Sequence, residues 1–140
     1  MSQGSGTVLV DTNVLIDVLQ DDATWAAWSL HQVRALSRVR RLAVNPVIYA
    51  ELAMSFDSAG ALDAQIDALE LSYVELSRSA LFLAGRAHMH YRRRGGTKDQ
   101  VLADFFIGAH AMVNGWTVLT RDAARFRTYF PRLNVISPEQ

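Results

Sequence analysis

The order of hydrophobic and polar residues along the chain alternates between short apolar runs and longer helical patterns. Runs of β-branched and apolar residues predict strands at 7–10, 42–44, 73–76, 116–119 and 133–136. Apolar residues spaced three and four apart predict helices at about 14–19, 22–41, 47–55, 58–69, 77–94, 98–113 and 126–130. Strands that alternate with helices predict an α/β protein with three α/β/α layers around a mostly parallel sheet.

Polar residues mark where several of these helices begin. Asn45 offers a capping side chain and Pro46 suits the first helical position, so a helix is expected directly after the second strand. Ser77 is expected to cap the long helix that follows the third strand, and either Asp22 or Thr24 is expected to cap the second helix.

Composition limits the class of protein. The chain has 140 residues, of which half are hydrophobic and a fifth are charged, so we expect one globular domain with residues 1–6 flexible. It has no cysteine, which excludes disulfides, thiolate zinc sites, iron–sulfur clusters and a cysteine nucleophile. The first residues lack a signal-peptide pattern, and no apolar run is long enough to span a bilayer. A soluble, cytoplasmic protein is therefore expected.

The net charge of zero hides a division along the chain. Residues 1–77 carry four Arg and ten acids, a balance of −6, while residues 78–140 carry ten basic residues and four acids, a balance of +6. Thirteen of the fourteen basic residues are Arg, whose planar head suits phosphate or carboxylate partners. Composition does not choose between these partners, and abundant Arg together with nineteen Ala also fits a GC-rich coding genome.

Two acids follow predicted strands. Asp11 comes directly after the first strand and Asp122 follows the strand at 116–119. Ligands of open parallel sheets bind beyond the carboxyl ends of the strands, so both carboxylates share one rim if these strands are neighbours. Each acid could instead cap the helix that follows it, because Asp is a favoured capping residue.

Two more acids lie on helices in apolar surroundings. Glu51 is the only charged residue between Arg41 and Asp57, and Asp104 is the only one between Asp99 and Arg121. Carboxylates in such places are costly unless they are paired, hydrogen-bonded or bound to a metal ion. Each could pair with a distant Arg. Together with the two acids at the strand ends they would instead suit Mg²⁺ or Mn²⁺, which oxygen ligands bind.

Four segments of the chain resemble the motifs of PIN domains. They are DTNVLID at 11–17, NPVIYAELAMS at 45–55, ADFFIGAHA at 103–111 and VLTRDAARF at 118–126. Their order, spacing and placement on strands or helices match from about Val8 to Pro138. Within the family the sequence is most similar to the small bacterial VapC-type toxins, which are endoribonucleases of type II toxin–antitoxin pairs.

The resemblance implies a metal-dependent phosphodiesterase that acts on RNA. The acids that match the family's metal pocket are Asp11, Glu51, Asp104 and Asp122, and Thr120 matches a hydroxyl residue that helps to position water or metal. The cofactor implied is Mg²⁺ or Mn²⁺. The partners implied are an RNA substrate and a cognate antitoxin, and a homodimer is expected.

A set of basic residues could contact RNA or a protein partner beside this pocket: Arg92, Arg93, Arg94, Lys98 and Arg121. A basic helix end is also what the helix dipole favours without any function.

Several polar residues receive a structural interpretation. Asp17 lies in the same motif as Asp11 but is expected on a solvated helix face or boundary. His88 and His90 are two residues apart and do not share a helix face, so a metal site is not expected there. His110 is expected to pack or to cap locally.

Other functions stay open at this point. A haloacid-dehalogenase-like phosphatase would need a second Asp where this chain has Asn13. A receiver domain would need an acidic pair after the first strand and a lysine after the last one, and neither is found. A silent PIN-like module that binds RNA or protein, and a PIN nuclease of RNA processing, are the remaining alternatives.

Overall fold

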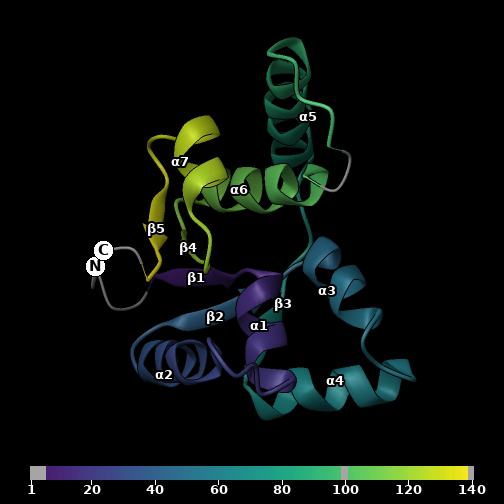
Figure 1. The fold of residues 1–140 in the computed structure, drawn as a ribbon, viewed down its shortest axis with the longest axis vertical. Coiled ribbons are helices and arrows are strands. Elements are labelled where there is room, and N and C mark those ends of the chain that lie inside the picture. Colours follow the sequence, from purple (N-terminus) through teal and green to yellow (C-terminus); the bar gives the residue numbers. More distant parts are fainter. Residues whose placement is uncertain (1–5, 99–100, 139–140) are drawn as a thin grey trace.

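The protein is built around a five-stranded parallel sheet, seen in the computed structural model, which describes residues 6–98 and 101–138 (Figure 1). The strands are β1 (Thr7–Val10), β2 (Arg41–Val44), β3 (Leu71–Tyr73), β4 (Thr117–Leu119) and β5 (Asn134–Ile136). Their order in the sheet is β3-β2-β1-β4-β5, and every neighbouring pair is parallel. The sequence analysis expected residues 1–6 to be flexible. Of these, residues 1–5 lie outside the described residues.

Helices cover both faces of the sheet. The chain passes through α1 (Thr12–Leu19), α2 (Ala26–Ser37), α3 (Pro46–Ala53) and α4 (Ala59–Ala68) before β3, and through α5 (Arg78–Arg93), α6 (Leu102–Asn114) and α7 (Ala124–Tyr129) after it. Figure 1 shows α2 and α4 below the sheet and α6 and α7 above it. The three-layer α/β/α architecture predicted from the sequence is therefore confirmed.

The strand order reverses at β1. The chain first builds outward through β2 to β3 and then returns to place β4 on the other side of β1. In open α/β sheets the crevice at such a reversal, beyond the carboxyl ends of the two central strands, is the usual place for a ligand. Here those two strands are β1 and β4.

The core lies on both sides of the two central strands. Val8, Leu9 and Val10 are fully buried, and Phe105 from α6 and Phe126 from α7 are the largest buried side chains. Next to them, Gly108 of α6 leaves room for Phe130, because a Cβ at this position would overlap the Phe130 ring. The absence of a side chain at Gly108 thus lets α6 approach the end of α7 closely.

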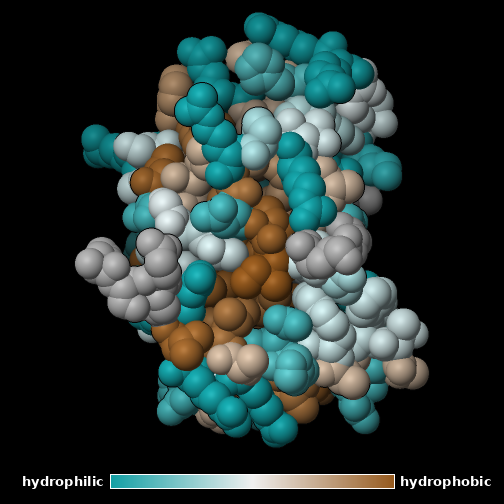
Figure 2. All heavy atoms as spheres, turned by 90° about the vertical axis from the view of Figure 1, so that its left-hand side faces the viewer, coloured by the Kyte–Doolittle hydropathy of each residue, from teal (hydrophilic) through white to brown (hydrophobic). Residues whose placement is uncertain are grey.

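Hydrophobic side chains also reach the surface on one side of the molecule. Figure 2 shows them gathered in the middle of the face that lies at the left of Figure 1, where β5 forms the edge of the sheet. Val135 and Ile136 of this edge strand are only half-buried. Within the part of the chain that the structure describes, no helix is both long and apolar enough to cross a membrane.

The capping residues predicted for two helices, α3 and α5, are confirmed. The Asn45 Oδ1 atom accepts a hydrogen bond from the Ile48 N–H at 2.9 Å, and Pro46 is the first residue of α3. The Ser77 Oγ atom accepts one from the Ala80 N–H at 3.2 Å and caps α5. These side chains satisfy N–H groups that the first turn of a helix leaves without partners.

Several predicted boundaries were wrong. The helix predicted to start at 98 starts at Leu102, and the second helix ends at Ser37 and not at 41, because Arg41 already belongs to β2. The third strand is 71–73 and not 73–76, because its register is set by parallel pairing with β2, in which Leu42 lies opposite Leu71. The second helix starts at Ala26, since Asp22 accepts hydrogen bonds from the main chain of Thr24 and Trp25 and so closes a turn ahead of the helix.

Candidate metal site at the ends of β1 and β4

Pairing of the two central strands brings Asp11 and Thr120 together. The Asp11 N–H donates to the Leu119 carbonyl at 2.9 Å, which extends the ladder by one residue beyond β1. The Thr120 hydroxyl donates to Asp11 Oδ2 at 2.7 Å and accepts from the Asp122 N–H at 3.1 Å. The two strands are neighbours, so the condition for a shared rim of Asp11 and Asp122 is met.

Asp11 also caps α1. Its second oxygen, Oδ1, accepts from the Thr12 N–H at 2.7 Å. The capping interpretation and the site interpretation of this residue are therefore compatible, because each uses a different carboxylate oxygen.

The surroundings of Asp11 disfavour its ionised form. Asp11 is only 5% exposed. This burial, together with the negative charges of Asp104 and Glu51, raises the pKa of Asp11 from 3.8 to about 7. The hydrogen bonds from Thr120 and Thr12 oppose the rise without cancelling it. A divalent cation bound at the carboxylates would oppose this shift, because its positive charge favours the ionised form of Asp11.

Glu51 is held at the rim by a hydroxyl group. It lies on α3, which follows the neighbouring strand β2, and its Oε1 atom accepts from the Thr12 Oγ1 atom at 2.5 Å. The alternative that Glu51 pairs with an Arg is not what the structure shows. Thr12 is a residue that sequence reasoning missed, although it lies inside the motif that begins at Asp11.

Asp104 does have an arginine partner. It lies in the first turn of α6, and its Oδ2 atom is 2.8 Å from Nη1 of Arg125 on α7. Burial raises the pKa of Asp104, the Arg125 guanidinium opposes the rise, and the charge of Asp122 adds to it. The alternative of a distant Arg partner is thus correct for this acid, and Arg125 is another residue that sequence reasoning did not single out.

The four acids share one rim without converging on one point. In the range 6–98 and 101–138, no group of three or more His, Asp or Glu side chains stands ready to hold a metal ion. The donor chemistry still fits Mg²⁺ or Mn²⁺, since all candidate ligands are carboxylate oxygens and the buried one lies beside like charges. Glu51 and Asp104 are engaged by Thr12 and Arg125 in the arrangement seen here.

Comparison with known proteins identifies the family. The sequence model of the PIN domain matches residues 8–130. The chain belongs to the PIN domain family. This agrees with the resemblance of the four segments to PIN motifs. A search of curated proteins found no significant match.

Solved structures share the PIN fold of the chain at low sequence identity. A chain of the VapBC2 complex from Rickettsia felis, bound to a promoter DNA fragment, is similar with a TM-score of 0.70 and 17% identity, over 94% of this chain and 98% of the other. A toxin–antitoxin complex from Klebsiella pneumoniae gives 0.69 and 19%, over 95% and 98%. VapBC-1 from Haemophilus influenzae gives 0.68 and 18%, over 94% and 97%.

A second buried acid of this PIN domain lies just behind the rim. Asp17 is 1% exposed, accepts from the Ser29 hydroxyl at 2.9 Å and forms an ion pair with Arg121 Nε at 2.8 Å. The prediction that Asp17 lies on a solvated face was therefore wrong. It faces inward because α1 packs against α2, which supplies Ser29. Arg121 is held by this pair and lies over the Trp25 ring, 5.6 Å from its centroid.

Two asparagines support the rim of the PIN domain from behind. The Asn13 side chain accepts from the Arg121 N–H at 3.2 Å and donates to Thr120 Oγ1 at 3.4 Å. The Asn45 amide contacts His110 Nδ1 at 3.1 Å, which ties α3 to α6. His110 is buried, and burial lowers its pKa. It packs in the interior as predicted, but its partner Asn45 is distant in the sequence and not local. The role of Asn13 was missed, although it stands two residues after Asp11.

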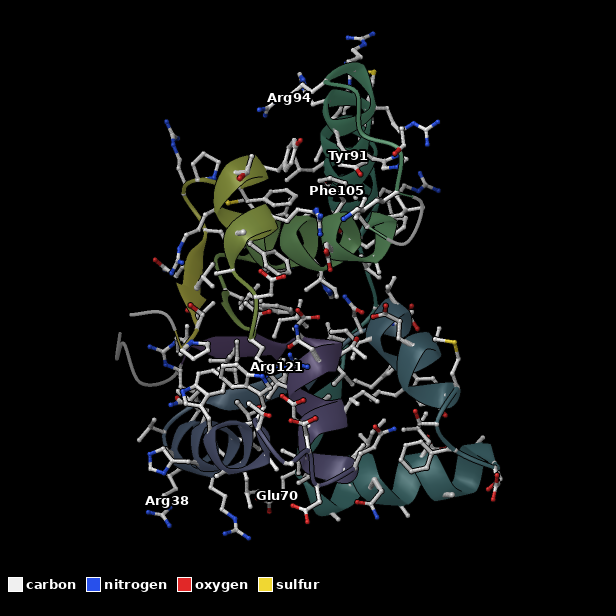
Figure 3. All side chains as sticks on the ribbon, in the orientation of Figure 1. Arg38, Glu70, Tyr91, Arg94, Phe105 and Arg121 are labelled. Atoms are coloured by element: carbon white, nitrogen blue, oxygen red, sulfur yellow. The ribbon has the colours of Figure 1, made fainter. Side chains whose placement is uncertain are left out.

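The basic cluster predicted from the sequence is divided in space. Figure 3 shows Arg94 at the far end of α5, whereas Arg121 lies beside α1. Arg94 lies over the Tyr129 ring of α7, 5.7 Å from its centroid, and the Lys98 N–H donates to the Tyr91 hydroxyl at 3.0 Å. The residues at positions 92–94 thus form a basic end of α5 that is separate from the rim.

Proposed function

We propose that the protein is a Mg²⁺- or Mn²⁺-dependent endoribonuclease, the toxin of a type II toxin–antitoxin pair, which acts in the cytoplasm and is inhibited by a cognate antitoxin. The observation that carries this proposal is Asp11: a buried carboxylate with a raised pKa, next to two more acids at the strand reversal of a PIN domain. The similarity to VapBC and other toxin–antitoxin complexes supports the biological role.

The residues that would hold the ion are Asp11, Glu51, Asp104 and Asp122. A bound Mg²⁺ or Mn²⁺ polarises a phosphate oxygen and lowers the pKa of bound water. The chain's own residues prepare the ligands: Thr120 fixes one oxygen of Asp11, and Thr12 fixes Glu51. Fixed ligands lose less entropy when they bind, which favours a defined site.

The basic residues would contact the RNA or the antitoxin. Arg92, Arg93, Arg94, Lys98 and Arg121 belong to this part of the proposal, because guanidinium and ammonium groups bind phosphates. Arg121 would act mainly through position, since its Nε atom is committed to Asp17. A homodimer remains part of the proposal.

The decisive experiment is cleavage of a looped RNA by the metal-stripped protein. Activity should appear with Mg²⁺ or Mn²⁺, vanish with EDTA and be absent from Asp11→Asn. Asp21→Asn is the matched control, because Asp21 is exposed and its positive φ suits Asn. A DNA strand of the same sequence tests the choice of substrate. Full activity in EDTA would contradict the proposal.

A second candidate is a silent PIN-like module that binds RNA or protein. It is favoured by the ion pair between Asp104 and Arg125, which occupies one candidate ligand. Among the described residues, the acids also form no ready group of three metal ligands. RNA binding without cleavage at any concentration of Mg²⁺ or Mn²⁺ would support this candidate. A PIN nuclease of RNA processing would cleave RNA but would not be inhibited by a co-expressed antitoxin.

A further inference from the structure

One of the four candidate acids, Asp104, is paired with a positively charged side chain of the same chain, that of Arg125. Arg125 and Asp104 lie on different helices, α7 and α6, and their side chains are 29% and 30% exposed. The contact joins Nη1 of the arginine to Oδ2 of the aspartate at 2.8 Å, which is a short charge-assisted hydrogen bond. Arg125 therefore occupies an oxygen that is a candidate metal ligand.

The second arginine near the rim, Arg121, does not pair with a candidate metal ligand. Arg121 pairs with Asp17, which lies behind the rim and is 2% exposed at its side chain. It is additionally fixed by the ring of Trp25. Its charge is thus balanced by an acid outside the candidate metal ligands, whereas the charge of Arg125 is balanced by one of them.

A guanidinium and a divalent cation cannot share this carboxylate at no cost. The two cations repel each other, and at a partly exposed position this repulsion is screened only in part. Hard divalent cations also need direct access to oxygen lone pairs, one of which the arginine hydrogen bond uses. Since both side chains are about a third exposed, the guanidinium has solvent to move into when it is displaced.

On this geometry, and resting on the proposed metal site, we propose that Arg125 is a positioning residue that competes with the divalent cation for Asp104. When the cation is absent, Arg125 holds Asp104 and offsets part of the repulsion among the acids. When the cation binds, Arg125 releases Asp104. The strength of the ion pair then sets part of the apparent affinity for the cation.

The test is a titration of metal-stripped protein with Mn²⁺, in which electron paramagnetic resonance counts the free ion. Arg125→Gln should bind Mn²⁺ roughly fivefold more tightly than wild type, the size expected when a partly exposed ion pair is lost as competitor. Arg125→Lys keeps the charge and should stay close to wild type. Arg132→Gln, at an exposed arginine on the loop after α7, is the matched control and should change nothing.

A double-mutant cycle separates competition from a general effect of charge. In the Asp104→Asn background, Arg125→Gln should leave the affinity for Mn²⁺ almost unchanged, because the contact that it removes no longer exists. Thermal unfolding in EDTA checks that every variant is folded.

Two outcomes would overturn the inference in different ways. Equal or weaker binding of Mn²⁺ by Arg125→Gln, in a protein that does bind the ion, rejects the competition and leaves the metal site standing. No binding of Mn²⁺ at millimolar concentration by either wild type or Arg125→Gln rejects the proposed metal site together with the competition.

Discussion

Asp11 and Asp17 lie six residues apart on the same segment, and both are buried, yet their surroundings are opposite. Asp17 has a cation, Arg121, and a hydroxyl donor, Ser29. Among the described residues, Asp11 has hydroxyl and main-chain donors as partners, and its charged neighbours are acids. Burial alone therefore does not distinguish these two carboxylates. They differ in the charge of their neighbours, and the proposed metal site rests on this difference.

The difference also separates two kinds of energetic role. A buried acid with its own arginine contributes to the native state, and loss of either partner leaves the other without compensation. A buried acid beside other acids lowers the free energy of unfolding unless a bound cation offsets the repulsion. The same segment thus carries one acid whose charge is balanced within the fold and, six residues away, one whose charge is not, which is the acid of the proposed metal site.

The largest effect is expected from Asp11→Asn. The raised pKa means that Asp11 favours the folded state while it is protonated, and this contribution is lost as the pH rises through about 7. The variant removes the cost of the buried charge, so in EDTA it should be about 4 kcal/mol more stable than wild type at pH 8 and gain less than half as much at pH 5. Urea unfolding at both pH values measures the gain.

The same variant should not cleave RNA at any pH. At a limiting concentration of the cation, wild-type activity should rise with pH through about 7, because the cation binds the ionised form of Asp11. Asp21→Asn is the control for both measurements and should follow wild type. A gain in stability that is equal at pH 5 and pH 8 would contradict the assigned cause.

Asp17→Asn should have the opposite sign. Asn keeps an acceptor for Ser29 but removes the charge that balances Arg121, whose side chain is 32% exposed. We expect a loss of about 2 kcal/mol, below the usual cost of breaking a fully buried pair, because Arg121 reaches solvent. Urea unfolding measures the loss, and Arg121→Gln added to it should cost little more. Unchanged stability would place Asp17 with Asp11 and remove the distinction.

Asp104→Asn should lie between these two cases. It removes the ion pair with Arg125 and also relieves repulsion from Asp122, two effects of opposite sign at a partly exposed site. The free energy of unfolding in EDTA should therefore change by less than about 1 kcal/mol, while cleavage is lost. A large loss of stability would mean that the pair with Arg125 is structural, like the pair of Asp17.

The smallest effect on stability is expected at the basic end of α5. Replacing Arg92, Arg93 and Arg94 together by Gln should weaken RNA binding and reduce the slope of log K against log salt by up to about 2, because fewer phosphates are neutralised. Filter binding at several salt concentrations measures the slope. Arg34→Gln with Arg38→Gln, at exposed positions on α2 and directly after it, is the control. An unchanged slope would leave the cluster as a solvated helix end.

Much of the fold could be predicted because its signals are local. Caps such as Asn45 and Ser77 mark helix starts, and β-branched runs mark strands, so a short window of sequence is enough to predict such an element. The third strand failed because its position depends on pairing with β2, which no short window contains. Strand order is equally non-local, and the shared rim of Asp11 and Asp122 could be stated only as a condition.

Two of the candidate acids, Glu51 and Asp104, could be found from the sequence because the residues around them are uncharged. Their hydrogen-bonding and ion-pair partners could not. Arg125 reaches Asp104 across 21 residues and Arg121 reaches Asp17 across 104, and several arginines in the sequence could have filled either place. Asp17 was misplaced for the same reason, since its own segment does not reveal the serine and arginine that meet it. Thr12 and Asn13 lie inside the segment DTNVLID, so the sequence did contain a local signal for these two residues.

The close approach at Gly108 gives the rim a fixed width. Gly108 stands one turn after Asp104 on α6, and Phe130 stands just after the helix that carries Arg125. The contact between Gly108 and the Phe130 ring thus limits how closely α6 and α7 approach each other, and neither residue carries a charge. One methyl group at position 108 would act as a spacer and move the acids of α6 and of the β4–α7 turn apart while every carboxylate stayed in the sequence. The spacing of the proposed metal ligands would therefore depend on a residue that has no side chain.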